Sequence, residues 1–449
     1  MAQLAADFYN AHPDAQPGRN PDFSRSGRSA GGMAGGGIAA DIIARTDHLA
    51  ADRSGWEREW RDLADYCLPT ASRAMSMSGT KGSSFDRMVD GPPSRDAARR
   101  RFDSTALTAI DRLAAGMESL VTPQSEKWHG LELDDPLAPE ATDEEKQWFE
   151  RVRDKMFAIR YEPRAGFVAA NQKAIRSTIT FGTGVTYVEE SFGAHGSDPR
   201  AMPALYRHIP LSQAYIGVNA QGEPDTLHRR FSMSARQAVQ RFEGRVSSKI
   251  TEAADDPKRC EQHFGFVHAV QPREEAGRSG TTTRGAAFAS YYVELDTKHL
   301  IGEGGFFEFP YIIYYWLQSD ESAYGESPAM LALDDIRGLN VTRKTALRAM
   351  QQWVDPPIAV AHDGVMNRPN LNPRAVNFGA IDNQGRNKIQ PILTAQSPAA
   401  VQEIIESERT VVRETMYNNL FQILISNPNM TATEAMLCLL YTSPSPRDS

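Results

Sequence analysis

One long predicted helix constrains the architecture of this chain more than any other feature. It lies in the stretch YGESPAMLALDDIRGLNVTRKTALRAMQQWVDPP, which runs from Tyr324 to Pro357. Ser327 is placed to begin the helix, and the double proline stops it, because proline cannot donate the backbone hydrogen bond that a helix interior needs. The helix spans about 26 residues and therefore roughly 39 Å.

A second long helix is predicted from Ser397 to about Leu424. Ser397 is a good N-cap, and Pro398 occupies the first helical position, where its missing N–H costs little. The segment between the two helices is rich in proline, glycine and asparagine, so we expect only short strands there. Two long helices around a small insertion predict a hairpin-like projection from a main body.

The first long helix begins with Asp334 and Asp335, whose carboxylates interact favourably with the helix dipole. Basic residues follow on more than one face: Arg337, Arg343, Lys344 and Arg348. They predict either a solvated face or contacts with a neighbouring copy or with passing phosphates. The broad apolar arc favours packing against other chains; its members are Met330, Leu333, Leu339, Ala346, Leu347, Met350 and Trp353.

Residues 1–37 are rich in small and polar residues and end in a glycine run. No strand precedes this run and no Gly-Lys-Ser/Thr follows it, so it predicts a flexible N-terminal arm and not a phosphate-binding loop. A helix is then expected from Ile38 to about Leu68, stopped by Pro69. Its apolar stripe at helical spacing predicts core packing; the members are Trp56, Trp60, Leu63 and Cys67.

The remaining part of residues 38–325 predicts an α+β unit, helices first and an antiparallel meander second. Asp103 is expected to cap a helix through Leu120, and a short strand is expected after TPQSEKWHG. Thr142 and Glu145 form a capping box for a helix to about Ile159. Further helices are expected at 163–180, ended by the glycines of FGTGVTYVEE, and after Ser232. Alternating runs predict strands: FGTGVTYVEE, ALYRHIPL, AYIGV, TLHRRFSM, FGFVHAVQP, FASYYVELD and FEFPYIIYYWL.

Composition limits the class of protein. The 449-residue chain is 41% hydrophobic with a formal net charge of -8, which argues against a protein that coats nucleic acid. Its cysteines, Cys67, Cys260 and Cys438, lie far apart and indicate a reducing compartment. The longest apolar run, FPYIIYYWL at 309–317, is too short to span a bilayer. These features predict a soluble, intracellular protein with no membrane partner.

The sequence offers little reactive chemistry. Cys260, His263 and His268 are a conceivable metal cluster, but no fourth ligand is suitably spaced, and a lone histidine in a strand is usually structural. Asp334 and Asp335 point about 100° apart on a helix and make a poor metal pair. No nucleotide-binding, nucleophile-elbow or metalloprotease motif is present. We therefore expect no catalytic residue, no cofactor and no metal, and hence no enzyme.

The order of several motifs resembles the portal, or head-to-tail connector, proteins of short-tailed bacteriophages. The motifs are WEREWRDLADYCLPT, FDSTALTAIDRLAAGMESLVTPQSEKW, FGTGVTYVEE, YGESPAMLALDDIRGLN, DPPIAV and NMTATEAM. The resemblance implies a homo-oligomeric ring, usually a dodecamer, at the capsid vertex of the virion, assembled in the host cytoplasm. Double-stranded DNA would pass through it without sequence specificity during packaging and ejection.

The resemblance also implies partners and a division of the chain. The partners are a terminase motor, a tail adaptor and the capsid or scaffold protein. The parts are a wing (38–325), a first stem helix (326–353), a clip (354–396), a second stem helix (397–424) and the start of a further helix (425–437). Ile358 and Val360 would lie in a clip strand, paired with a neighbouring subunit. The alternatives are another phage adaptor, which is usually shorter, a capsid-associated ring protein, or a DNA-processing enzyme.

The chain departs from the family at its end. After TATEAM a portal is expected to continue through a long helix to a C-terminal crown, but this sequence finishes CLLYTSPSPRDS. Residues 438–449 resemble a translated sequencing adapter. We therefore expect the native sequence to stop near Leu437 and the crown to be missing.

Overall fold

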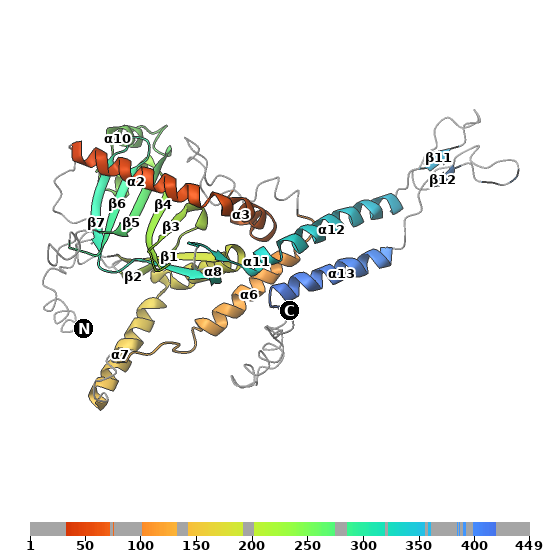
Figure 1. The fold of residues 1–449 in the computed structure, drawn as a ribbon, viewed down its shortest axis with the longest axis horizontal. Helices are drawn as coiled ribbons and strands as arrows, with labels where there is room; N and C mark the ends of the chain where they lie inside the picture. The colour runs from red at the N-terminus through yellow and green to blue at the C-terminus, as the bar shows by residue number, and fades with distance from the viewer. Residues whose placement is uncertain are drawn as a thin grey trace.

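The computed structural model describes residues 33–71, 75, 101–132, 142–191, 202–273, 285–318, 322–354, 358–360, 384, 386, 389–391 and 398–418. Figure 1 shows a body of helices and sheets from which two long helices project side by side. The predicted α+β class is confirmed. Within the described residues, no helix is long and apolar enough to cross a membrane.

The larger sheet is an antiparallel meander of five strands in the order β3-β4-β5-β6-β7. Its strands are β3 (Ala214–Val218), β4 (Pro224–Ser234), β5 (His263–Pro272), β6 (Phe288–Glu294) and β7 (Leu300–Phe306). The meander confirms the sequence prediction, except that β7 was not predicted. Its sequence, LIGEGGF, contains three glycines, which weaken the alternating pattern of a strand.

A smaller sheet has the order β2-β1-β8 and is also antiparallel. Its strands are β1 (Thr183–Ser191), β2 (Met202–His208) and β8 (Tyr311–Tyr315). A short hairpin of β9 (Leu317–Gln318) and β10 (Gly325–Glu326) follows β8 and leads the chain toward the projecting helices. The smaller sheet therefore lies where the body meets the projection.

Helices cover both faces of the larger sheet. On one face, Ala39 and Ile42 of α2 (Met33–Asp52) pack with Val267 and Ala269 of β5. On the other, α9 (Ala235–Arg241) and α10 (Ser248–Asp255) pack against Phe266 and its neighbours. Successive side chains of a strand point to opposite faces, which is why β5 serves both layers.

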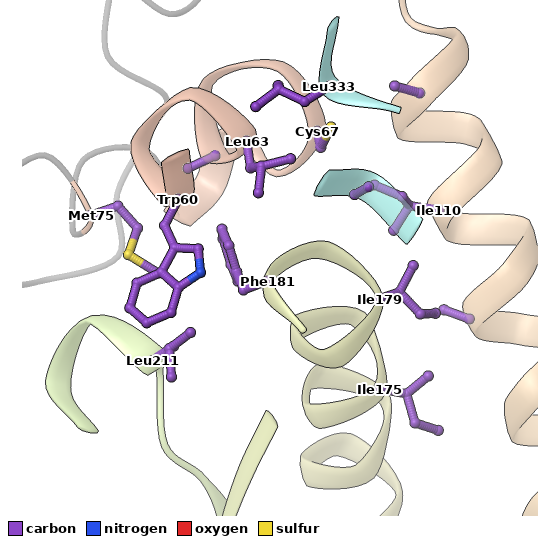
Figure 2. Packing of buried hydrophobic residues seen from close by; sticks show 14 of the residues in the cluster. Trp60, Leu63, Cys67, Met75, Ile110, Ile175, Ile179, Phe181, Leu211 and Leu333 are labelled. Carbon is purple, nitrogen blue, oxygen red and sulfur yellow. The ribbon is translucent and has the colours of Figure 1, made fainter. Parts of the chain in front are cut away.

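The main core lies between the smaller sheet and α3 (Ser54–Cys67), α6 (Thr105–Val121), α8 (Phe167–Phe181) and α11 (Pro328–Leu331). Figure 2 shows Trp60, Leu63 and Cys67 pointing into it. The predicted apolar stripe is therefore core. Burial raises the pKa of the Cys67 thiol to about 12, so this cysteine is unreactive.

His268 has a structural role, as expected for a lone histidine in a strand. Its two ring nitrogens lie 3.0 Å from Ser290 Oγ and 2.8 Å from Tyr311 Oη, and its ring stacks on Tyr292. Burial lowers its pKa well below the ordinary value. The described residues contain no group of three or more side chains that could hold a metal ion.

Several helix boundaries differ from the predictions. The expected helix from Ile38 to Leu68 is two helices, separated at Arg53, and the first begins at Met33, inside the predicted arm. The helix expected at 163–180 is a short 3₁₀ turn, η2 (Pro163–Ala165), followed by α8. Gly166 separates them with a positive φ of 72°. No strand forms at 123–132.

The predictions of the helix caps were also partly confirmed and partly wrong. The predicted capping box of Thr142 and Glu145 is confirmed at the start of α7 (Asp143–Arg160). The prediction for α9 was wrong by two residues, because Ser234 caps the helix with Gln237, and Ser232 lies within β4. The N-cap of α6 is Ser104, one residue after the predicted Asp103, although Asp103 Oδ1 does accept from the N–H of the first helical residue, Thr105, at 2.8 Å.

Arg53 separates α2 from α3 and is fully buried. Its guanidinium donates to Glu57 Oε1 at 2.9 Å and to the Leu211 carbonyl at 2.9 Å, and it lies 3.9 Å from the Tyr215 ring centroid. It also donates to the Ala214 carbonyl. One side chain thus joins the first two helices to the start of the larger sheet.

We expect Arg53→Met to lower the free energy of unfolding by about 3–5 kcal/mol, because it removes a fully buried donor from the Glu57 carboxylate and from the carbonyls of Leu211 and Ala214. Urea titration followed by tryptophan fluorescence would measure the change. Arg61→Met is the matched control, because Arg61 binds the same carboxylate from a half-exposed position and should cost less than about 1 kcal/mol. Equal losses in the two variants would contradict the assignment.

Candidate functional site: the helical hairpin and its junction with the body

The projecting feature is an antiparallel pair of helices, α12 (Leu333–Val354) and α13 (Pro398–Thr415), here called the helical hairpin. Figure 1 shows the two helices leaving the body together, with the short strands β11 (Ile358–Val360) and β12 (Ile389–Pro391) at the far end. Leu339 and Ala346 of α12 are buried in the same cluster as Ile405 and Val412 of α13. The predicted pair of long helices is therefore present.

The first long helix is interrupted once, which the sequence analysis did not predict. Helix α11 ends at Leu331, and α12 begins at Leu333 after a turn at Ala332. Ser327 begins α11 as predicted: its Oγ accepts from the Met330 N–H at 3.0 Å. The same hydroxyl donates to the Thr180 carbonyl at the end of α8, also at 3.0 Å. Ser327 therefore ties the start of the projection to the body.

Two glycines form the closest contact at this junction. Gly182 ends α8 with a φ of 76°, and a Cβ there would lie 1.9 Å from the Gly325 carbonyl oxygen. A Cβ on Gly325 would lie 2.6 Å from the Gly182 oxygen. The Gly325 N–H donates to Thr183 Oγ1 at 3.0 Å. The motifs FGTG and YGESP, distant in sequence, therefore meet backbone to backbone.

Tyr324 fills the space beside these glycines. Its hydroxyl accepts from the Ile216 N–H at 3.1 Å, and its ring meets the edge of Trp60 at 5.1 Å between centroids. Trp60 in turn stacks on Trp56. Burial raises the pKa of Tyr324 above its ordinary value, so its hydroxyl stays protonated. The tryptophans of the motif WEREW thus pack directly against the tyrosine of the motif YGESP.

A polar network joins both helices of the hairpin to the N-terminal end of α6. Asn340 Oδ1 accepts from the Phe102 and Asp103 N–H groups at 2.8 and 3.1 Å, and its Nδ2 donates to the Ile336 carbonyl. Arg409 of α13 donates to Asp103 Oδ2 at 2.7 Å. Asp103 is buried, which by itself would raise its pKa, but hydrogen bonds from Thr105 and Arg409 hold the pKa below its ordinary value.

The four predicted basic residues of α12 have different environments. Arg337 is paired within the chain, with Asp62 of α3 and with Asp334 at 2.8 Å. Arg343 is half-buried, and the Lys344 ammonium lies 5.5 Å from the centre of the Phe102 ring. Arg348 is exposed. The structure therefore does not gather these four residues into one site.

The predicted clip strand is present. Ile358 pairs with Pro391 and Val360 with Ile389, so one edge of β11 joins β12 of the same chain, and pairing with a neighbouring subunit stays a prediction. Ser397, the C-terminal end of the predicted second helix, most of the predicted clip and the segments 425–437 and 438–449 lie outside the described residues.

Sequence reasoning missed the residues that hold the hairpin to the body: Asn340, Asp103 as an ion-pair partner, Arg409, Tyr324, and Thr180 as acceptor for Ser327. One signal was available for Asn340, which stands one position beyond Leu339 on the body-facing side of a helix, where a buried polar side chain needs a partner. The partner itself, 238 positions earlier in the chain, has no local signal.

Comparison with known proteins identifies this arrangement. The family model described as "Bacteriophage head to tail connecting protein" matches residues 39–438, and the chain belongs to this family. It is 26% identical over 405 residues to the probable portal protein of Bordetella phage BPP-1, covering 88% of this chain and 67% of the relative. It is 24% identical over 387 residues to the portal protein of Salmonella phage epsilon15, covering 85% and 65%.

The predicted resemblance to phage portal proteins is confirmed by these matches. The chain spans about two thirds of the length of these curated relatives. Their names describe portals, and the family description places the chain among the proteins that connect a phage head to its tail.

We expect Gly182→Ala to lower the free energy of unfolding by at least about 3 kcal/mol, because the new Cβ would overlap the Gly325 carbonyl and the backbone has a positive φ. Gly55→Ala in α3 is the control, since nothing lies within 4 Å of its Cβ position and alanine favours a helix. Chemical denaturation would compare them. A Gly182→Ala variant as stable as the Gly55→Ala variant would refute the close contact.

The depressed pKa of Asp103 predicts acid sensitivity. A carboxyl group whose folded-state pKa is lowered stabilises the fold above its unfolded pKa of about 4 and loses that contribution as pH falls through the folded value. The difference in melting temperature between the parent chain and Asp103→Asn should therefore shrink below about pH 4. Asp111→Asn, at an exposed carboxylate on the same helix, should show little difference at any pH. If the difference in melting temperature between the parent chain and Asp103→Asn stayed constant down to pH 2.5, the ionised Asp103 carboxylate would not stabilise the fold as proposed.

Proposed function

We propose that the chain is a portal subunit, a structural protein that forms a ring of identical copies at one vertex of the phage capsid. The family match over residues 39–438 carries the proposal. The described structure supports it, because a mixed body with a projecting helical hairpin provides the elements that a conduit needs. The ring would be a dodecamer, as is usual in the family. It would assemble in the host cytoplasm and become part of the virion.

In this proposal the body, residues 38–325, is the wing. Helices α11 and α12 form the first stem, α13 belongs to the second stem, and the segment that contains β11 and β12 is the clip. The hairpin leaves the body as a unit, because its base is anchored by Ser327, Asn340 and Arg409. A rigid base suits a wall element that must keep its shape while DNA moves past it.

The charge of the chain suits passage of DNA without retention. Tight binding to phosphates requires clusters of unpaired basic side chains. The net charge is -8, and Arg337 is neutralised by two aspartates of its own chain. We propose that double-stranded DNA passes through the ring without sequence specificity, that a terminase motor drives it, and that a tail adaptor and the capsid or scaffold protein bind the ring from outside.

The role is one of assembly and conduction, without catalysis. The residues that could have suggested chemistry serve the fold: His268 is held by Ser290 and Tyr311, and Cys260 Sγ donates to the Pro257 carbonyl. Nucleotide hydrolysis by the pure protein would contradict this part of the proposal.

The purified protein should form rings of about a dozen subunits with a central hole in negative-stain electron microscopy. Gly338→Pro should abolish them, because proline within α12 removes a backbone hydrogen bond and breaks the helix. Gly338→Ala is the matched control, since nothing lies within 4 Å of the added Cβ, and its rings should be intact. Monomers at all protein and salt concentrations would refute the portal assignment, and intact Gly338→Pro rings would refute the placement of the stem.

A further inference from the structure

The helical hairpin has a side that faces inward, between its own two helices. Leu339 of α12 and Ile405 of α13 are buried there, and Thr342 Oγ1 donates to Glu408 Oε1 at 3.0 Å. A second side faces the body, through Asn340 and Arg409. This leaves the outward edges of α12 and α13, on opposite sides of the hairpin, for contacts with other molecules.

Helical geometry identifies the residues on these edges. Successive residues are about 100° apart, so positions two, five and nine residues from a buried residue lie within about 40° of the opposite side. Counted from Leu339, these are Val341, Lys344 and Arg348, and all three are exposed. We call them the α12 edge. The Lys344 ammonium lies 5.5 Å from the centre of the Phe102 ring in the body, so the charge that this edge leaves free is Arg348, beside Val341, which is 64% exposed.

Counted in both directions from Ile405, the residues of the α13 edge are Glu403, two positions before it, and Ser407, Thr410 and Glu414 after it, with Val411 beside them. All are exposed. This edge carries two negative charges and an apolar side chain that is 43% exposed. Within the described part of the chain, neither Arg348 nor the two glutamates of this edge takes part in an ion pair.

The two edges also match in level along the hairpin. Because the helices are antiparallel and Thr342 meets Glu408, each step forward on α12 corresponds to one step back on α13. Arg348 is therefore within one residue, about 1.5 Å, of the level of Glu403, and Val341 is within two residues of the level of Thr410 and Val411. A second copy that is related to the first by rotation about an axis along the hairpin has each residue at the same level. Such a rotation would bring the basic residue of the α12 edge close to the acidic residue of the α13 edge, and the exposed valine of one edge close to that of the other.

We propose that the α12 edge of one copy packs against the α13 edge of the next, with Arg348 facing Glu403 across the contact and Val341 packing beside Val411. The inference rests on the proposed ring and deepens it, since it names the surfaces that join the subunits. Opposite charges at matched levels define the occupant as a second copy of this chain, and the contact is head-to-tail because the two edges differ.

Charge reversal tests the contact. Arg348→Glu and Glu403→Arg each place like charges across it, so each variant alone should lose rings by at least about fivefold, as counted in negative-stain images. An equimolar mixture of the two should restore rings, because alternating copies face each other with opposite charges at every contact. Lys258→Glu, the same charge change at an exposed turn of the body, should leave rings unchanged.

The outcomes separate the two proposals. Rings in the parent chain that persist in both single variants would overturn the edge contact and leave the portal assignment intact. Loss of rings in both variants without rescue by mixing would also overturn it, because a direct pairing across the contact requires rescue. Melting temperatures equal to the parent value would show that the exposed substitutions leave the subunit folded. An absence of rings in the parent chain would instead refute the proposed function.

Discussion

The structure depends on a backbone contact in which two glycines touch with no side chain between them. At Gly182 and Gly325 the end of α8 and the short β9–β10 hairpin approach until even one methyl group would overlap a carbonyl oxygen. Three hydrogen bonds surround this contact: the Gly325 N–H donates to Thr183 Oγ1, the Ser327 hydroxyl donates to the Thr180 carbonyl, and the Gly182 carbonyl accepts from the Trp316 N–H at 3.1 Å. They join the body and the hairpin at the point where the two backbones are closest.

A second layer of contacts fixes the direction of the hairpin. Asn340 of α12 and Asp103, just before α6, are both nearly inaccessible: Asn340 accepts from the Asp103 N–H, and Asp103 accepts from the N–H of Thr105, which the helix end would otherwise leave unpaired. Arg409 then brings the returning helix to the same point. Three helices therefore meet at one polar cluster beside an apolar core, and the position of each is set by hydrogen bonds as well as by packing.

Much of the fold was predictable from the sequence, because its signals are local. The stripe of Trp60, Leu63 and Cys67, the capping box of α7 and the alternation of the meander each depend on neighbours within a few residues. The positions at which helices are interrupted were harder to predict. Arg53 divides a helix because its guanidinium reaches the carbonyls of Leu211 and Ala214, and these lie about 160 residues later in the chain. Strand β7 was not predicted because its three glycines weaken the alternating pattern, whereas pairing with β6 forms the strand despite them.

The candidate site was less predictable from the sequence, because its contacts join residues that are far apart in the chain. The basic residues of α12 were identifiable by type, but their roles depend on what lies opposite them, as Arg337 shows by pairing with Asp62 of α3. The pairing of β11 with β12 joins two short segments about thirty residues apart, so it too had no local signal. The family resemblance located the elements, and the contacts between them required coordinates.

In the proposed ring, the opposite charges of the two hairpin edges have a consequence for how copies would add to one another. An arc of any length always ends in one basic edge and one acidic edge, and a two-fold dimer cannot satisfy both. Only closure removes the two free ends together, so every incomplete arc retains the means to recruit another copy at either end. The number of copies is then set by the angle between the two edges, which belongs to the shape of the single subunit and not to the strength of any one contact.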